Sequence, residues 1–481
     1  MNDPSATEFD ETYYDKLMDG LEAIEIKLSV CKDIIDFRID ANTYKKEYVR
    51  TDKILKSLNI YSIEDKMKSI QNFGAYSLCN DIVFTDDGEP FLMTQNIRHN
   101  YIDWNIIRYI DEKSHKMLYK SHCKKGQVLV TMAGEYLGRV AVYDQDFICS
   151  SNQAIAKITL EDGISPYYVA TFLNSRYGQN QINRLKTVTG QPNINMALIK
   201  SLKIPFLSDK FIRVIESIVM YSNETYKRAN NFYHEAEKCL VGALGLTNFS
   251  PKVEKYSIKY LKDSFAKTGR MDAEFYQQKY DDLFNKLNCF KCKKLGDVVK
   301  IKKSIEPGSD SYSDEGIPFV RVGDITKYGI TKPTIKLPYN LLENIEDLFP
   351  AKGTILLSKD GSVGIAYKIE ESDSFITSSA LLHLHVLNES EINLDYLTLL
   401  LNSKVVQMQA ERDAGGSIIQ HWKPSEIADV VIPILDKNIQ DNISNRIKTA
   451  FEFRKKSQML LEQAICLVET AIEQGEDAVL K

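Results

Sequence analysis

The sequence lacks the long apolar stretches and the dense cysteines that mark membrane and secreted proteins. No apolar run approaches the roughly 18 to 20 residues that a membrane-spanning helix needs. The N-terminus, MNDPSATEFDETYYDKL, has neither the basic start nor the apolar stretch of a signal peptide. The eight cysteines are scattered along the chain, which is typical of a reducing compartment. We therefore expect a cytoplasmic protein that makes no membrane contact.

An excess of basic charge is also missing. The chain has 66 acidic and 61 basic side chains, a formal net charge of -5 and a pI near 5.9. Bulk positive charge therefore cannot hold a nucleic acid here, and any such binding would have to be local. The length of 481 residues, with 43% hydrophobic residues, predicts two to four globular domains at roughly 100 to 200 residues each.

Motifs of the common catalytic and metal sites are absent too. The chain has no glycine-rich phosphate loop with its lysine, no His-Glu-x-x-His, no Gly-x-Ser-x-Gly and no Asn-Pro-Pro-Tyr. Cys289 and Cys292 form a single Cys-x-x-Cys without a second pair. His383 and His385 alternate in an apolar run without an evident third ligand, which favours a structural role. We expect no catalytic residue and no metal site in this chain.

What the sequence does contain is an internal repeat. FRIDANTYKKEY around Asp40 matches GRMDAEFYQQKY around Asp272 at a shift of 232. Five collinear matches follow at shifts near 228: PFLMTQNI with PFVRVGDI, GQVLVTMAGEYLGRVAV with GTILLSKDGSVGIAY, FICSS with FITSS, YVATFLNS with YLTLLLNS, and IKSLKIPFL with IADVVIPIL. Each copy mixes apolar runs broken by glycine, typical of strands, with stretches of helical spacing. The repeat predicts an α+β protein with two tandem mixed α/β units.

A long helix with the same apolar seam follows each copy. The seam positions are Ile215, Val219, Ser222, Tyr226, Ala229, Tyr233, Ala236, Leu240 and Ala243 in the first helix, and Ile443, Ile447, Ala450, Arg454, Ser457, Leu461, Ala464, Val468 and Ala471 in the second. Their 3.5-residue repeat predicts that the two helices pair as a coiled coil. The polar Ser222, Arg454 and Ser457 predict that part of the seam is solvated. The alternative is that each helix packs only on its own unit.

These features predict an order of six segments. They are an N-terminal helical segment at 1–38, a first unit at 39–210, a first long helix at 211–246, a connector at 247–270, a second unit at 271–436 and a second long helix at 437–481. Apolar residues in the N-terminal segment again step by three and four, as in Leu17, Leu21, Ile24 and Leu28. We therefore expect this segment to complete the second repeat, in a pseudo-twofold circular arrangement.

The order of these motifs resembles the specificity subunits of type I restriction-modification systems, in both halves of the chain. The shared pattern is an Arg-x-Asp-Ala start, glycine-bounded apolar strands, an Ile-x-Ser-Ser segment, a Leu-Asn-Ser helix and a GQPNIN loop before Ile-Pro. The second copy departs from this pattern at GGSIIQHWKP. The resemblance implies two target recognition domains, separated by paired helices, that each read one half of an asymmetric double-stranded DNA site.

The resemblance also implies that this chain does no chemistry itself and binds no cofactor. Adenine methylation would belong to two methyltransferase (modification) subunits docked on the helices, and translocation and cleavage to separate restriction subunits. S-adenosylmethionine, ATP and Mg would then bind to those partner subunits. Four heptads from Ile215 to Ala243 make a helix of about 42 Å, and half-sites one DNA turn apart lie roughly 34 to 36 Å from each other. The helices are therefore expected to set the unread spacer.

Base reading needs Arg, Lys, Asn and Gln at groove edges, with small polar groups on phosphates. In the first unit the candidates are Arg184, Lys186, Thr187, Thr189, Gly190, Gln191, Asn193 and Asn195 in one loop, and Gln95, Asn96, Arg98, His99 and Asn100 in another. In the second unit they are Arg412, Ser417, Gln420, His421 and Lys423, then Arg321, Asp324, Lys327 and Tyr328, and finally Lys359 and Ser362 after a strand. Trp422 is a candidate for either the loop or the core. The alternative for each residue is a solvated loop.

Two other functions stay open on the sequence alone. One is a non-catalytic protein scaffold of the same repeat architecture without sequence-specific DNA binding. The other is an enzyme whose catalytic cluster has no recognisable motif. Salt-dependent binding to a specific DNA site would separate the DNA-reading function from the scaffold.

Overall fold

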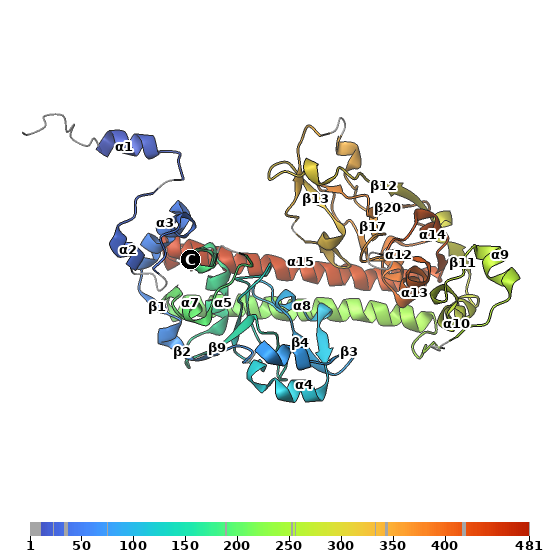
Figure 1. Cartoon of the computed structure of the whole chain (residues 1–481), viewed down its shortest axis with the longest axis horizontal. Coiled ribbons are helices and arrows are strands. Elements are labelled where there is room, and N and C mark those ends of the chain that lie inside the picture. The colour runs from blue at the N-terminus through green and yellow to red at the C-terminus, as the bar shows by residue number, and fades with distance from the viewer. Residues whose placement is uncertain are drawn as a thin grey trace, which may run out of the picture. The chain divides into compact units, whose positions relative to one another are not determined.

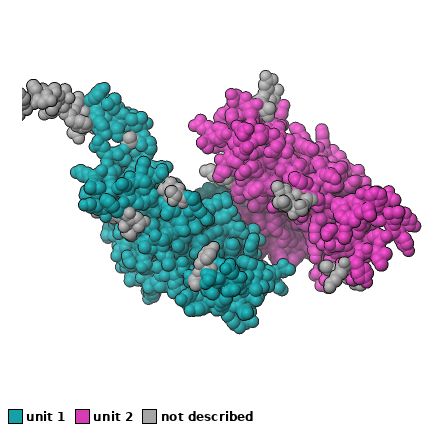
Figure 2. Space-filling view, viewed as in Figure 1, with its two compact units in different colours: residues 1–225, 455–481 teal, residues 226–454 magenta. Residues whose placement is uncertain are grey.

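The computed structural model describes residues 11–22, 24–32, 37–74, 76–187, 190–251, 254, 256–331, 333–341, 345–415 and 420–480. The chain forms two compact units, and Figure 2 colours them separately. Unit 1 consists of Met1–Thr225 and Lys455–Lys481, and unit 2 consists of Tyr226–Arg454. Each of the two long helices therefore contributes one part to each unit. Among the described residues, no helix has the length and apolar character needed to cross a membrane.

Unit 1 is built from short helices around two four-stranded sheets (Figure 1). Its helices are α1 (Glu11–Met18), α2 (Leu28–Lys32), α3 (Lys46–Lys56), α4 (Glu112–Met117), α5 (Pro166–Asn174), α6 (Arg176–Leu185), α7 (Met196–Lys200) and the first part of α8 (Asp209–Ala243). Its strands are β1 (Ile60–Ser62), β2 (Met67–Gln71), β3 (Phe84–Thr85), β4 (Glu89–Leu92), β5 (Arg108–Ile110), β6 (Val128–Thr131), β7 (Val140–Val142), β8 (Ser150–Ser151), β9 (Ile155–Leu160) and β10 (Lys203–Pro205). The sheet orders are β2-β9-β6-β7, which is antiparallel throughout, and β3-β5-β4-β8, while β1 pairs with β10.

Unit 2 repeats this plan. Its helices are α9 (Phe265–Thr268), α10 (Gln278–Leu287), α11 (Leu295–Val298), α12 (Leu394–Leu401), α13 (Lys404–Asp413), α14 (Pro424–Ala428) and the first part of α15 (Lys437–Gln474). Its strands are β11 (Cys292–Lys294), β12 (Val299–Lys303), β13 (Ile317–Val320), β14 (Ile325–Thr326), β15 (Gly329–Ile330), β16 (Lys336–Leu337), β17 (Ile355–Ser358), β18 (Ala366–Lys368), β19 (Ile376–Thr377), β20 (Leu381–Val386) and β21 (Val431–Pro433). The main sheet has the order β12-β20-β17-β18, which matches that of unit 1, and β11 pairs with β21.

The predicted α+β repeat is confirmed down to individual hydrogen bonds. The hydroxyl of Tyr168 donates to the carbonyl oxygen of Pro205 at 2.8 Å, and that of Tyr396 donates to Pro433 at the same distance. The side chain of Asn174 bonds to the amide and the carbonyl of Val140 on β7. Asn402 does the same to the amide and the carbonyl of Ala366 on β18. The sequence repeat therefore encodes one set of contacts used twice.

Alternation along the central strands places their side chains in two different cores. In β6, Val128 and Val130 belong to the cluster that includes α5, while Leu129 packs on the opposite side of the sheet. In β17, Ile355 and Leu357 face one cluster and Leu356 the other. Successive side chains of a strand point to opposite faces, so a strand buried on both faces is apolar at every position. This explains why the two strands read as unbroken apolar runs.

The predicted helix seam is buried in both units, including its two serines, except at Arg454 and Ala243, which are partly buried. In unit 1, Val219 of α8 and Leu461 of α15 belong to the same core cluster. Ser222 and Ser457 are 0% and 3% exposed, and their hydroxyl oxygens lie 2.9 Å apart. The expectation that these serines leave part of the seam solvated is wrong, because each hydroxyl satisfies the other and no water is needed.

Within unit 2 the two helices also contact each other and run antiparallel. The guanidinium of Arg454 donates to Tyr226 and, at 2.6 Å, to Asn230, while Arg446 pairs with Glu235 further along α8. Residue numbers therefore fall on α15 as they rise on α8. Phe232 and Phe453 are stacked, with ring centroids 5.6 Å apart. At the end of the α8 seam Leu244 is buried, whereas Ala243 is only partly buried.

The N-terminal segment belongs to unit 1 by its contacts. The ammonium of Lys46, at the start of α3, donates to the carbonyl of Met18 at the end of α1. The carboxylate of Glu22 accepts a hydrogen bond from the amide of Lys46 at 2.8 Å. Part of the predicted segment 1–38, namely 1–10, 23 and 33–36, lies outside the described residues. The circular closure of the second repeat by this segment stays a prediction.

Candidate functional site

The α6–α7 loop of unit 1 presents polar side chains to solvent from a frame closed by its own backbone. The amide of Thr187 donates to the carbonyl of Asn193 at 2.9 Å, and the amide of Asn193 donates to the hydroxyl of Thr187 at 3.1 Å. Gly190 has a φ of 68°, a left-handed conformation that glycine adopts without steric cost. Asn195 caps α7 by accepting from the amide of Leu198 at 2.9 Å. Thr189, also predicted here, lies outside the described residues.

The loop lies against the turn between β6 and β7. The backbone amide of Gly134 donates to the carbonyl of Pro192 at 3.1 Å, and a β-carbon at Gly134 would lie 3.1 Å from the side-chain nitrogen Nε2 of Gln191. The turn adds Arg139, whose guanidinium lies 4.4 Å from the centroid of the Tyr136 ring. Sequence reasoning missed this turn in unit 1. The signal was available, because GQVLVTMAGEYLGRVAV aligns with the segment that holds Lys359 and Ser362.

Unit 2 brings the corresponding loop and turn together. The amide of Gly361 donates to the carbonyl of Gln420 at 2.9 Å, and the amide of Trp422 donates to that of Lys359 at 2.8 Å. The imidazole Nδ1 of His421 lies 2.9 Å from a carboxylate oxygen of Asp360. The Trp422 side chain is 1% exposed and belongs to the core, which decides between the two possibilities for that residue. Ser417 lies outside the described residues.

The exposed candidates are those that a ligand in solution can reach. They are Thr187, Gly190, Gln191, Asn193 and Asn195 in the unit 1 loop, His99 in the other unit 1 group, Gln420, His421 and Lys423 in the unit 2 loop, and Ser362 and Arg321 elsewhere in unit 2. Gln95, Lys186, Asp324, Lys359 and Arg412 are partly buried. Amide, hydroxyl and cationic groups of this kind suit base edges and phosphates.

Two predicted surface residues, Asn96 and Arg184, are instead buried and hydrogen-bonded within unit 1. Asn96 is 0% exposed, accepts from the amide of Met93 and donates to the carbonyl of Asp103. Arg184 is 7% exposed, donates to the carbonyl of Thr43 at 3.0 Å and forms an ion pair with Asp52. The expectation that these two side chains face solvent is corrected, because their polar atoms hold the fold together.

The second candidate group lies differently in the two units. In unit 1 the pKa of Arg139 in the turn is lowered. Burial is the largest cause, and the positive charge of the nearby Arg98 is the next. His99 lies next to these arginines and contacts Asn174, with Nδ1 2.9 Å from Oδ1. Asn100 is 1% exposed, with its oxygen bonded to Asn174, so the expectation that it faces solvent is corrected as for Asn96 and Arg184.

In unit 2 the equivalent residues turn toward the long helices. The ammonium of Lys327 lies 2.7 Å from a carboxylate oxygen of Glu237 on α8 and 4.7 Å from the centroid of the Tyr233 ring. The guanidinium of Arg454 lies 4.0 Å from the centroid of the Tyr328 ring. Lys327 and Tyr328 therefore connect the β14–β15 hairpin to the helix pair within unit 2.

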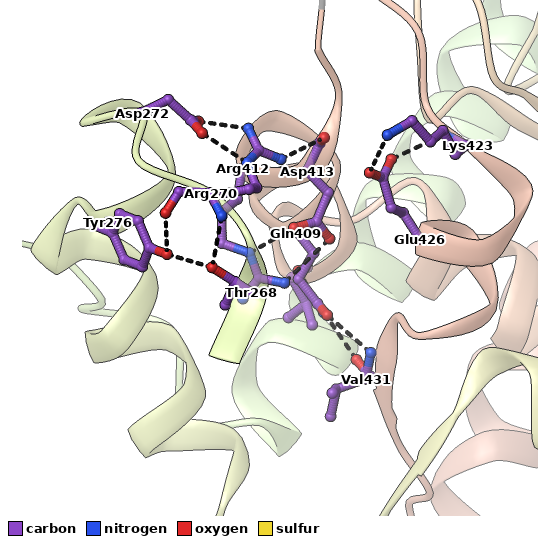
Figure 3. A network of polar contacts seen from close by, with 11 residues as sticks. Thr268, Arg270, Asp272, Tyr276, Gln409, Arg412, Asp413, Lys423, Glu426 and Val431 are labelled. Carbon is purple, nitrogen blue, oxygen red and sulfur yellow. Dashed lines mark hydrogen bonds and ion pairs between the residues drawn. The ribbon is translucent and has the colours of Figure 1, made fainter. Parts of the chain in front are cut away.

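A polar network holds both ends of the unit 2 loop (Figure 3). Where the loop begins, the guanidinium of Arg270 donates to the carbonyl of Asp413 at 3.0 Å and to the carboxylate of Asp272. The neighbouring Arg412 donates twice to the Asp413 carboxylate, at 2.7 and 3.1 Å. Where the loop ends, Glu426 accepts from the amide of Lys423 at 3.1 Å.

The two aspartates of this network have pKa values that are shifted in opposite directions. The hydrogen bond from Arg270 is the largest cause that lowers the pKa of Asp272, so this carboxylate stays ionised well below neutral pH. Burial raises the pKa of Asp413, against the opposing effect of Arg412. In unit 1, Arg38 takes the place of Arg270 and Asp40 that of Asp272, with the guanidinium 2.8 Å from the carboxylate.

The titratable residues outside the loops bond to their neighbours. His383 is 5% exposed and lies 2.8 Å from the hydroxyl of Thr377, and burial lowers its pKa to about 4. The thiol of Cys292 donates to the carbonyl of Leu287, and Cys289 is exposed. Within the described ranges, no three His, Cys, Asp or Glu side chains gather as metal ligands would.

Comparison with known proteins shows which family part of this chain is similar to. Residues 289–463, from β11 into α15, match the model of the family described as Type I restriction modification DNA specificity domain. The specificity subunit of the type I restriction enzyme EcoBI of Escherichia coli is 23% identical over 150 residues. That match covers 30% of this chain and about a third, 31%, of the length of that relative.

Two solved structures are similar over most of the chain. The S subunit of a type I restriction-modification system from M. genitalium is 14% identical, with a TM-score of 0.38 over 86% of this chain and 96% of that one. The HsdS subunit of Thermoanaerobacter tengcongensis is 12% identical, with a TM-score of 0.27 over 87% and 97%. Over residues 289–463, from β11 into α15, the chain is therefore similar to the DNA specificity domain of type I restriction-modification systems.

Proposed function

We propose that this chain is the DNA-reading subunit of a type I restriction-modification complex, and that each unit reads one half of a bipartite, asymmetric double-stranded site. One observation carries the proposal: both units hold a loop on the same frame, but the loops present different side chains. Gln191 and Asn193 face solvent in unit 1, whereas Gln420, His421 and Lys423 do so in unit 2. Equal frames with unequal side chains are what two different half-sites require.

The chemistry of these side chains fits base recognition. Asn and Gln pair with the adenine edge in the major groove, and Lys and Arg pair with guanine. The amides of the loop backbone and the hydroxyls of Thr187 and Ser362 suit phosphate oxygens. A net charge of -5 supplies little bulk attraction, so selectivity would come from these local contacts.

We further propose that α8 and α15 set the spacer between the half-sites and dock two methyltransferase subunits. The 35 residues of α8 make a helix of about 52 Å, longer than the roughly 34 to 36 Å between half-sites one turn apart. In this proposal the chain itself does no chemistry. The methyl donor, ATP and Mg bind to the methyltransferase and restriction subunits.

Adenine methylation mapping tests the function. The chain is expressed together with a methyltransferase subunit that co-purifies with it, and genomic adenine methylation is sequenced. We expect one bipartite motif with a fixed spacer. Exchanging residues 40–210 for those of a relative should change only one half of the motif. Methylation at no bipartite motif would favour the scaffold, and a change in both halves would contradict independent reading.

A deletion in register tests the spacer. In unit 2 the helices pair with Tyr226 near Arg454, so removing residues 226–232 together with 448–454 shortens both helices at facing positions. Seven residues correspond to about 10.5 Å of helix, or about three base pairs at 3.4 Å each. The spacer should shorten accordingly. Removing only 226–232 serves as the control and should break the pairing and the assembly. An unchanged spacer in the double deletion would refute the role of the helices.

A further inference from the structure

We propose that Arg270 and its counterpart Arg38 are positioning residues for half-site recognition, each fixing the direction in which its loop leaves the preceding helix. This inference rests on the proposed DNA-reading function. Neither arginine needs to touch DNA. Each would act through the backbone at the base of the loop, and each would act on one half-site only.

The geometry in unit 2 gives Arg270 two tasks at once. Its Nε donates to one carboxylate oxygen of Asp272 at 2.8 Å and its Nη2 to the other at 2.5 Å. Its remaining arm, Nη1, donates to the carbonyl oxygen of Asp413 at 3.0 Å. Asp413 is the last residue of α13, where carbonyl groups have no partner within the helix. Arg270 therefore supplies the missing donor, together with a positive charge that suits a helix C-terminus.

The same contacts recur in unit 1. Nη1 of Arg38 donates to the carbonyl of Arg184 at 3.2 Å and to that of Lys186 at 2.8 Å. Its Nε bonds to Asp40. Thr187, the first exposed residue of the loop, follows Lys186 directly. A tyrosine holds the backbone of each arginine in turn, with Tyr44 donating to the carbonyl of Arg38.

In each unit, an arginine bonds both to an aspartate and to a carbonyl at the end of a helix, and we call this arrangement the clamp. Its repetition in both units speaks against a chance contact. In unit 2, Tyr276 donates to the carbonyl of Arg270 at 3.0 Å, as Tyr44 does to Arg38. Arg270 stands 143 residues before Asp413, so the start of the unit fixes the exit of a distant loop. Beyond the clamp, Gly415 and His421 exchange two backbone hydrogen bonds. The position of the backbone at Asp413 therefore influences where His421 and Lys423 lie.

Only arginine can do both tasks. Its planar guanidinium presents five donors in a fixed fork, so two can bind a carboxylate while another reaches a carbonyl. A lysine has its three donors on a single nitrogen, so it cannot reproduce the forked set of contacts that arginine makes here. Recognition is sensitive to small shifts, since a site displaced by about 1 Å loses its contacts. A loosened loop should therefore discriminate poorly between bases although the domain stays folded.

The test uses the full-length chain and duplex DNA selected by the wild-type chain from a randomised library. Binding is then measured to the selected duplex and to two versions in which one or the other half-site is scrambled. We expect Arg270→Ala to lose about tenfold or more of the discrimination at one half-site, the size of one or two mismatches. Discrimination at the other half-site and the salt-dependent non-specific binding should remain. Arg38→Ala should give the mirror result, and Arg270→Lys should rescue little.

The control variant is Lys279→Ala. Lys279 contacts the same helix α13, through Glu411 at 2.6 Å, but does not reach the loop base. It should leave both half-sites unchanged. If Arg270→Ala proves unstable, Asp272→Asn keeps the shape and removes the charge that orients Arg270, and it should loosen the same half-site to a smaller degree.

The outcomes separate the two proposals. Full discrimination at both half-sites by folded Arg270→Ala and Arg38→Ala would overturn the positioning role while leaving DNA reading intact. An equal loss at both half-sites from either variant would also overturn it, because that result indicates general unfolding. Failure of the wild-type chain to select any bipartite sequence would overturn DNA reading, and the positioning role with it.

Discussion

Lys157 of β9, opposite Leu129 of β6, and His383 of β20, opposite Leu356 of β17, occupy the same position in the strand register of their two units, and each bonds to a hydroxyl group of the neighbouring sheet. The ammonium of Lys157 lies 2.9 Å from the hydroxyl of Ser151, and Nε2 of His383 lies 2.8 Å from that of Thr377. Both side chains are buried, at 0% and 5% exposure. Two different bases therefore serve one structural site, and they titrate in different pH ranges.

The two tryptophans allow each unit to be followed alone. Trp104 lies in unit 1 and Trp422 in unit 2, and the chain has no other tryptophan. A Trp422→Phe background leaves fluorescence that reports only on unit 1, and Trp104→Phe leaves a signal from unit 2. Urea unfolding in these backgrounds gives a separate free energy of unfolding for each unit.

We predict that Lys157 contributes a gain in the stability of unit 1 as pH rises from about 8 to about 10.5. Burial lowers the pKa of Lys157 from 10.5 to about 8, so between these values the unfolded chain binds more protons than the folded one. The free energy of unfolding should then rise by up to about 1.4 kcal/mol per pH unit. Lys157→Met should remove this rise. Lys113→Met, at an exposed lysine, should keep it, and a difference in stability between wild type and Lys157→Met that does not change with pH would contradict the assignment.

Unit 2 should show the same behaviour in an acid range. Burial lowers the pKa of His383 from 6.5 to about 4, so the unfolded chain binds more protons between these values. The contribution of His383 to the free energy of unfolding should be fully present above about pH 6.5. It should fall toward pH 4, again by up to about 1.4 kcal/mol per pH unit. Urea titrations of His383→Gln should show a flatter profile. His234→Gln, at an exposed histidine of α8, should leave the profile unchanged.

The paired tyrosines predict matched losses confined to one unit each. Tyr168→Phe and Tyr396→Phe each remove a buried hydroxyl and leave the carbonyl of Pro205 or Pro433 without its donor. Each change should cost its own unit about 1 to 2 kcal/mol. The free energy of unfolding of the other unit should not move. Equal losses in both units from one substitution would show that the units unfold together.

The serine pair of the helices predicts non-additive effects. Ser222→Ala leaves the Ser457 hydroxyl buried without its partner, and should cost unit 1 about 1 kcal/mol or more. Ser457→Ala should cost a similar amount. The double variant should cost less than the sum, because no hydroxyl is then left unpaired. Additive losses in urea unfolding would mean that the two hydroxyls do not interact.

The 3.5-residue spacing of the helix seam and the internal sequence repeat made much of this architecture predictable. The 3.5-residue spacing identified Ile215, Val219, Val468 and Ala471 as buried seam residues, and the structure buries all four. Short apolar runs broken by glycine identified the central strands. Both patterns follow from backbone geometry, which repeats with the sequence and needs no knowledge of distant contacts.

Burial of polar residues was less predictable, because it depends on partners far along the chain. Arg184 looks like a surface residue next to Lys186, but its guanidinium is held by Asp52, 132 residues away. The solvation expected at Ser222 failed for the same reason, since its partner Ser457 lies 235 residues away. The Arg270 clamp was not found either, although the Arg-x-Asp-Ala match had marked its position.

The division of the long helices has a consequence for synthesis on the ribosome. Unit 1 contains Lys455–Lys481, and its core includes Leu461, Ala464 and Val468 from α15. Unit 1 is therefore the first to begin emerging, but it cannot complete its core until these late residues leave the exit tunnel. Unit 2 draws on an uninterrupted stretch and can finish earlier. Chain order and folding order thus run in opposite directions, and the nascent first unit must wait with an open apolar face.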